Sequence, residues 1–198
     1  WRRVLALAEA VPTPPVDVLT NTYQMLSGTL QFEGKSKEAL DYADRGLAFA
    51  DRQHVPADAP LRVNLLRGRA EALVGLGDPA GAEVAIRRAI AIQGKAVGGG
   101  GTRMSILQNS LGIVLNDLGR YREALQALNQ SDALDGAASA APSEAAISLT
   151  NLASVHENAG DYVAAVGLGQ RALAKLDQAG LAADAPERRM IERVLART

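Results

Sequence analysis

The sequence predicts an all-α fold, a solenoid of antiparallel helix pairs, from three regularities. Four glycines suited to ending helices follow one another at intervals of 43, 42 and 41 residues: Gly34, Gly77, Gly119 and Gly160. Small residues recur at three fixed distances from these glycines, as is required where two helices approach closely. Large apolar residues, mostly leucine, fill two further columns. Each copy is therefore predicted to be a helix, a glycine turn and a second helix.

The three columns of small residues define the register of the repeat. They lie seven residues before, five after and twelve after each glycine, and none holds a residue larger than serine: Ser27, Ala70, Gly112 and Ala153; Ala39, Ala82, Ala124 and Ala165; Gly46, Ala89, Ser131 and Ala172. The apolar columns lie eight and four residues before the glycine, where Arg69 and His156 are the exceptions. We expect all of these columns to be packed between helices.

Two copies show a pattern that resembles the tetratricopeptide repeats: Leu111-Gly112, Gly119, Tyr121 and Ala124, and Leu152-Ala153, Gly160, Tyr162 and Ala165. The usual period of that family is about 34 residues. The longer connections here bring the period near 42, which is similar to the kinesin-light-chain-like branch. The resemblance implies a right-handed superhelical, TPR-like solenoid with a concave groove that binds a peptide or partner domain.

The elements can be placed in order along one predicted TPR-like domain, residues 1–198. Residues 1–15 are expected to end a preceding repeat, and residues 184–198 to form the first helix of a further repeat or a cap. Four repeats lie between them: residues 16–57, 58–101, 102–142 and 143–183. Capping residues mark the helix starts: Asp58, Asp78, Thr102, Ser143 and Asp184. The chain opens without methionine inside a helical pattern, so we expect it to be part of a longer protein.

Composition excludes several function classes. Lys and Arg number 21 against 22 Asp and Glu, and the only basic concentration is interpreted as a solvated helix face: Arg188, Arg189, Arg193 and Arg197. No nucleic-acid partner is therefore expected. Cysteine is absent, which excludes thiolate sites and disulfides. No apolar run approaches the roughly 20 residues of a membrane helix, so we expect no membrane partner and a cytoplasmic location. Richness in alanine, arginine and glycine suggests a bacterial source.

Nothing in the sequence indicates catalysis, a cofactor or a metal site. His156 occupies a leucine column and is interpreted as a partly buried packing residue, while His54 lacks the further ligands that a metal needs. The glycines Gly98–Gly101 follow Lys95, whereas a phosphate-binding loop has its lysine after the glycines. They are interpreted as a flexible linker. We therefore predict that the protein is not an enzyme and has no cofactor.

A polar stripe on the first helices is the candidate binding site. It lies mainly 13, 10, 6 and 3 residues before each glycine, on the face that tetratricopeptide arrays turn toward their groove: Asn21, Gln24, Asn64, Arg67, Glu71, Asn109, Asn116, Thr150, Asn151, Ser154 and Glu157. Amides can donate to and accept from a peptide backbone, so this face suits an extended segment. The family's carboxylate clamp requires Lys or Arg where this chain has Ile106 and Ser110, which disfavours that ligand class.

Two functional hypotheses remain open. The first is a non-enzymatic scaffold that binds a protein or peptide in the groove. The alternative is an intramolecular regulatory or sensor segment of a larger bacterial signalling protein, a kinase or a transcription regulator. The apolar stripes of the two terminal helices are expected to be covered by adjoining repeats or domains in the parent protein: Trp1, Leu5 and Ala8 at the start, and Ile191, Val194 and Leu195 at the finish. In the isolated chain the C-terminal stripe is expected to stay exposed on one side, and the terminal helices to support weak self-association.

Overall fold

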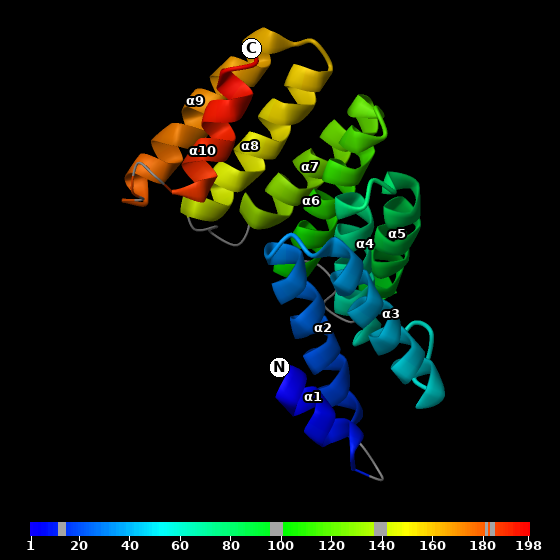
Figure 1. Cartoon of the computed structure of the whole chain (residues 1–198). Coiled ribbons are helices and arrows are strands. Elements are labelled where there is room, and N and C mark those ends of the chain that lie inside the picture. The colour runs from blue at the N-terminus through cyan, green and yellow to red at the C-terminus, as the bar shows by residue number, and fades with distance from the viewer. Residues whose placement is uncertain (12–14, 96–100, 137–141, 181, 183–184) are drawn as a thin grey trace. The chain divides into compact units, whose positions relative to one another are not determined.

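The computed structural model describes residues 1–11, 15–95, 101–136, 142–180, 182 and 185–198, and within these ranges it contains ten α-helices and no β-strand. The helices are α1 (Arg2–Glu9), α2 (Val16–Phe32), α3 (Ser36–Arg52), α4 (Arg62–Gly75), α5 (Pro79–Lys95), α6 (Thr102–Asp117), α7 (Tyr121–Gly136), α8 (Pro142–Asn158), α9 (Tyr162–Gln178) and α10 (Pro186–Leu195) (Figure 1). This confirms the predicted all-α class and the helix pairs around the four glycines.

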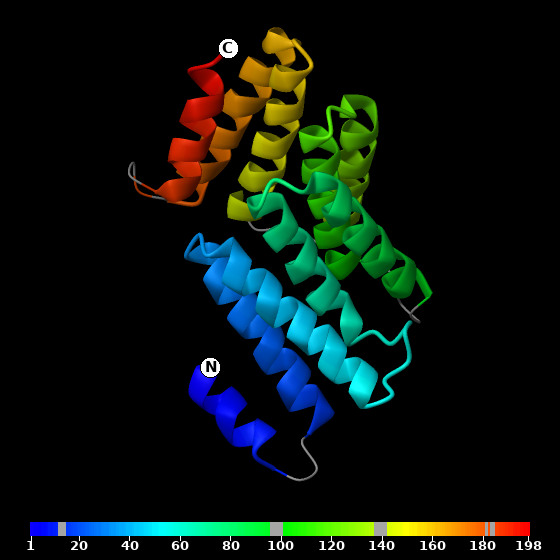
Figure 2. The same cartoon turned by 45° about the vertical axis from the view of Figure 1, so that its right-hand side comes forward.

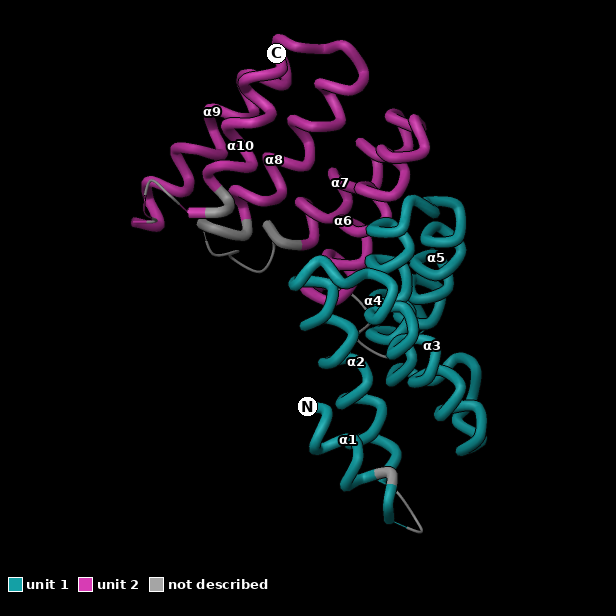
Figure 3. The backbone as a smooth tube through the Cα atoms, in the orientation of Figure 1, with its two compact units in different colours: residues 1–99 teal, residues 100–198 magenta. Residues whose placement is uncertain are grey.

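The chain divides into two compact units, residues 1–99 and residues 100–198 (Figure 3). Unit 1 contains α1 to α5, and in it the antiparallel pairs α2–α3 and α4–α5 pack side by side (Figure 2). Unit 2 contains α6 to α10, with the pairs α6–α7 and α8–α9 followed by α10, which packs on α8 and α9. Each unit therefore consists of two complete repeats and one further helix.

The four repeat glycines end their helices in the same way. Each takes a positive φ, between 72° at Gly119 and 82° at Gly160. At Gly119 the glycine N–H donates to Asn116 O over 2.9 Å, and the next N–H, of Arg120, donates to Leu115 O over 2.9 Å. The same two bonds recur at the other three glycines. This is the geometry in which a left-handed residue satisfies the last carbonyls of a helix, and glycine adopts it without steric cost.

His54 occupies the equivalent position at the end of α3, with a φ of 55°. Its N–H donates to Asp51 O over 3.0 Å, and Val55 N–H donates to Ala50 O over 2.9 Å. The helix is thus terminated as at the glycines, but by a residue with a Cβ. His54 therefore has a structural role, the termination of α3, which spacing along the sequence did not indicate.

The small-residue columns are buried in every repeat, as predicted. Their packing is tight: a Cβ at Gly46 would lie 2.6 Å from Leu65 Cδ2, and one at Gly112 would lie 2.6 Å from Leu128 Cγ. A side chain that added volume there would displace the neighbouring helix, because protein interiors are close-packed. The columns therefore fix the distance between helices.

The helix starts agree with the predicted caps only in part. Asp78 is confirmed, since Gly81 N–H donates to Asp78 Oδ1 over 2.9 Å. Thr102 is not a cap but the first residue of α6, and Gly101 precedes it with a φ of 83°. Ser143 lies inside the first turn of α8. Both helices therefore start one or two residues earlier than predicted: α6 begins at Thr102, directly after Gly101, and α8 begins at Pro142.

Asp58 does not cap α4, which begins later at Arg62 and has no side-chain cap. Arg62 itself explains the shift, because it is only 3% exposed and donates to two carbonyls of the preceding connection, Val55 O at 2.6 Å and Pro56 O at 2.9 Å. Its guanidinium also lies 2.7 Å from Asp51 Oδ1. A buried arginine needs such partners, so the connection folds around this side chain and delays the helix.

The terminal helix α10 corrects the predicted uncovered stripe. Ile191 and Val194 are 1% and 7% exposed, and Leu195 lies over Gly169, where a Cβ would be 2.7 Å from Leu195 Cδ2. The stripe therefore packs on α8 and α9, because the glycine of α9 admits a close approach. The predicted cap Asp184 lies outside the described residues.

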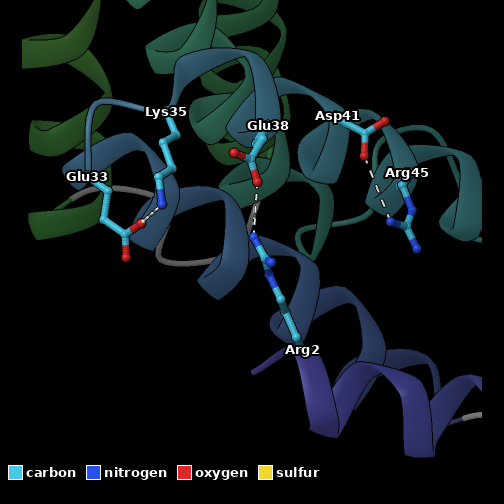
Figure 4. Close-up of polar contacts among 6 residues, drawn as sticks. All are labelled: Arg2, Glu33, Lys35, Glu38, Asp41 and Arg45. Carbon is cyan, nitrogen blue, oxygen red and sulfur yellow. Dashed lines mark hydrogen bonds and ion pairs between the residues drawn. The ribbon is translucent and has the colours of Figure 1, made fainter.

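At the other end, α1 packs one face and exposes another. Leu5 is 4% exposed and joins the core of α2 and α3. Trp1 remains 55% exposed, together with other apolar side chains of this segment: Val4, Leu7 and Val11. Arg2 pairs with Glu38 of α3 over 3.0 Å (Figure 4).

The turn between α2 and α3 is lined by surface charges (Figure 4). Lys35 Nζ donates to Glu33 Oε2 over 2.7 Å, and this bond lowers the pKa of Glu33 and raises the pKa of Lys35. Arg45 lies 3.8 Å from Asp41 one turn along α3. Exposed pairs of this kind contribute little to stability, so the close helix packing holds unit 1 together.

Candidate functional site

Unit 2 contains a hollow of about 340 Å³ between its first helices. Side chains of α6, α8 and α10 form most of its lining, and Leu128 of α7 contributes to it: Ile113, Asn116, Asp117, Asn151, Ser154, Met190, Arg193, Val194 and Arg197. This volume is at the lower end of the range for ligand pockets. The lining combines apolar side chains with amides, one hydroxyl and charged groups. Three residues of the predicted stripe meet here, namely Asn116, Asn151 and Ser154.

The amides of the hollow belong to a ladder between α6 and α8. Asn151 Nδ2 donates to Asn109 Oδ1 over 2.9 Å, and Asn158 Nδ2 donates to Asn116 Oδ1 over 3.0 Å. Each pair is separated by 42 residues, which is one repeat. The Asn116 amino group and the Asn151 carbonyl oxygen take part in neither of these two bonds, and both residues line the hollow.

Two stripe residues of α8 have surroundings that spacing did not predict. Thr150, which was predicted as a groove residue, is 2% exposed and donates to Ala146 O in its own helix over 2.7 Å. Glu157 is 9% exposed, and its Oε2 is buried without a hydrogen-bond partner among the described residues. Its nearest cation is Arg197, whose Nη1 lies 4.0 Å from Glu157 Oε1.

The charged residues of the hollow were not predicted as site residues. Asp117 is the last residue of α6, and burial raises the pKa of its carboxyl group. Arg193 of α10 and Arg197, which follows the end of α10, belong to the basic set that sequence reasoning assigned to solvent; both are exposed, and both also line the hollow. The prediction that residues 184–198 form the first helix of a further repeat or a cap was the available signal, because such a first helix would extend the face formed by α6 and α8.

The stripe residues of unit 1 form a separate set on α2 and α4. Asn21 is exposed, whereas Gln24, Asn64, Arg67 and Glu71 are half-buried. Arg67 and Glu71 form an ion pair one turn apart on α4. Gln31 Nε2 of α2 donates to the backbone oxygen of Glu71 over 3.1 Å, so polar contacts also join the first helices here.

The surroundings of both histidines indicate structural roles. His156 is half-buried, and its Nδ1 lies 3.1 Å from Asp161 Oδ2, while Oδ1 of the same carboxylate accepts from Ala164 N–H at the start of α9.

No cluster of three or more His, Asp or Glu suited to a metal ion occurs in the described ranges. The predicted linker Gly98–Gly101 lies outside these ranges except for its last glycine. None of the helices described is both long and apolar enough to cross a bilayer.

Helix pairs with a glycine turn, buried small columns and a period near 42 define a tetratricopeptide-like repeat array. Solved structures with the same fold include BtubC (BKLC) from P. vanneervenii, at 18% identity and a TM-score of 0.75 over 93% of this chain and 74% of that one. A putative kinesin light chain with nearly identical TPR-like repeats, from Podosopora anserina, has 21% identity and a TM-score of 0.72 over 93% and 87%. The fold is thus kinesin-light-chain-like.

A third similar structure, the apo form of RapI, has 14% identity and a TM-score of 0.68. That similarity covers 95% of this chain but 48% of RapI, so the same fold occurs there within a longer chain. Comparison with models of known protein families finds no match, and neither does comparison with curated protein sequences.

Proposed function

We propose that this protein is a non-catalytic interaction scaffold, and that the hollow of unit 2 binds an extended segment of a partner protein. Since a fold alone does not define a function, the proposal rests on the lining of this hollow. Ile113, Met190 and Val194 offer apolar contact, while Asn116 and Asn151 offer a donor and an acceptor. An extended peptide needs this combination, because its backbone presents N–H and C=O groups between side chains.

The single observation that carries the proposal is that each of these two amides uses only one of its two polar groups in the ladder. Asn116 and Asn151 each use one polar group to join α6 to α8, and both residues line the hollow with a second polar group that takes part in neither ladder bond. The ladder therefore holds the free groups in place before a ligand arrives, which lowers the entropic cost of binding.

A displayed library of random peptides, selected against the parent protein, tests this proposal. Ser154→Trp should abolish binding of the selected peptides, because Ser154 lines the hollow and an indole there would fill it. Its melting curve verifies that the fold is retained. Ala174→Trp on the exposed side of α9 is the matched control and should bind as the parent does. Selected peptides that bind Ser154→Trp as well as the parent would place the site elsewhere.

The regulatory alternative has one supporting observation, the occurrence of this fold as less than half of the longer RapI chain. In that case the occupant of the hollow would be a segment of the same polypeptide. The Ser154→Trp substitution separates the two in the natural full-length protein, because an intramolecular occupant, once displaced, changes the activity of its own attached domain.

A further inference from the structure

The buried carboxylate of Glu157 is the least satisfied polar group near the hollow. Its side chain is 9% exposed, and Oε2 has no hydrogen-bond partner among the described residues. A buried charge without a partner is unfavourable, because the interior replaces neither the hydration nor the hydrogen bonds of water. Glu157 is not itself among the residues that line the hollow, but Arg197, which lines it, lies 4.0 Å from Glu157 Oε1.

The cation nearest to Glu157 is loosely held. Arg197 Nη1 is 4.0 Å from Glu157 Oε1, which is too long for a hydrogen bond. The Arg197 side chain is 69% exposed and lines the hollow from the turn that follows α10. Because an exposed arginine is already solvated and mobile, moving it away from Glu157 costs little.

We infer that Arg197 occupies the place of a partner's cationic side chain, and that the hollow selects a segment whose arginine or lysine displaces Arg197 and pairs with Glu157. This inference rests on the proposed peptide-binding function and adds the chemistry of the ligand. The incoming guanidinium or ammonium forms with the Glu157 carboxylate the charge-assisted hydrogen bond that Arg197 does not form. Asp117 adds a second acidic group to the same hollow.

The opposite assignment, an anionic ligand on Arg193 and Arg197, is less favourable. Both arginines are exposed, so water already stabilises their charges and a new partner adds little. Glu157 is buried, so its unpaired oxygen gains more from a partner than a solvated group does. An anion would also approach the carboxylates of Glu157 and Asp117.

The test uses pools of fluorescein-labelled short peptides that differ at one central position and are otherwise randomised among uncharged residues. The centre is arginine, its uncharged isostere citrulline, or glutamate. We expect the parent to bind the arginine pool about tenfold more tightly than the citrulline pool, because a hydrogen bond between charged groups contributes a free energy of that size. Glu157→Gln should remove this preference. Arg197→Ala should tighten binding of the arginine pool, because it removes the competing side chain.

The sign of the Arg197→Ala effect decides between the two ligand classes. Weaker binding of the arginine pool by Arg197→Ala, or an unchanged preference in Glu157→Gln, overturns the inference. So does a preference of the parent for the glutamate pool that Arg197→Ala abolishes. Arg122→Ala and Glu123→Gln, in the first turn of α7, are matched controls that should bind as the parent does. Thermal melts verify that all variants are folded.

Failure of the inference is distinguishable from failure of the proposed function. If peptides of all pools bind equally and Ser154→Trp blocks them, the hollow binds peptides but Glu157 does not select them. If no pool binds in a way that Ser154→Trp blocks, the proposed function itself is wrong.

Discussion

Asn151 Nδ2 donates a hydrogen bond to Asn109 Oδ1 over 2.9 Å, and the two residues stand 42 positions apart in neighbouring repeats. Asn158 and Asn116 repeat the contact further along the same two helices. Spacing alone assigns Asn109, Asn116 and Asn151 to a ligand-binding face. The structure adds that they also join α6 to α8, and this dual use has a measurable consequence for stability.

We expect Asn109→Ala and Asn151→Ala each to lower the free energy of unfolding by about 0.5–1.5 kcal/mol, the usual contribution of one hydrogen bond. Chemical denaturation of both single variants and the double variant measures their coupling, which should be nonzero because the two side chains share one bond. Asn129→Ala on the exposed side of α7 is the control. Strictly additive effects would mean that the bond does not form in solution.

Replacing Ala124 by leucine should destabilise unit 2 by about 1–3 kcal/mol, because the added atoms overpack a filled interior. Ala124 is fully buried, and its carbonyl oxygen would lie 3.3 Å from a Cβ at Gly112 of the facing helix. The midpoint of urea unfolding measures the effect. Ala174→Leu, which adds the same atoms at an exposed position of α9, should leave the midpoint nearly unchanged.

His54→Gly should stabilise unit 1, by up to about 1 kcal/mol, because glycine relieves the cost of a left-handed backbone. The φ of 55° at His54 matches the role of the glycines that end the other helices. Thermal melts of the parent, His54→Gly and His54→Ala test this directly. An alanine variant as stable as the glycine variant would show that the imidazole, not the backbone, is responsible.

Asp117→Asn should raise the melting temperature at neutral pH. Burial raises the pKa of Asp117, so the folded state keeps this proton to a higher pH than the unfolded chain does. The contribution of this carboxyl group to stability therefore falls as the pH rises through that window. Its place at the C-terminal end of α6 adds an unfavourable interaction with the helix dipole.

The gain from Asp117→Asn should disappear at a pH below 3.8, the ordinary pKa of the carboxyl group, because the parent is then neutral in both states. Melting curves of the two proteins across this pH range make the comparison. A gain that persists in acid would assign the effect to packing and not to charge.

Self-association should depend on α1 and not on α10. The exposed apolar side chains of α1 include Leu7 at 65%, whereas the stripe of α10 is packed on α8 and α9. We expect Leu7→Ser to weaken any concentration-dependent dimer seen by sedimentation, and Met190→Ser on α10 to leave it unchanged. The reverse pattern would show that α10 leaves its packed position in solution.

The sequence by itself determined the repeat, the helix ends and the packed faces of this protein. These features are local or periodic: a positive φ at the end of a helix favours glycine, and close helix contacts require small residues such as Ala124 at constant spacing. The prediction was weakest at starts such as Asp58, because the buried Arg62 organises the connection through contacts that no local pattern encodes.

Only the tertiary structure decided which polar residues remain available for a ligand. Thr150 and Asn151 are neighbours in the same stripe, yet one is satisfied within its own helix and the other reaches the preceding repeat. Glu157 is buried, and Arg197 approaches it from the turn after α10, which spacing along α8 does not reveal. The hydrogen-bond partner of a polar side chain depends on its rotamer and on the distance to a helix one repeat away. Both are set only when the helices are packed.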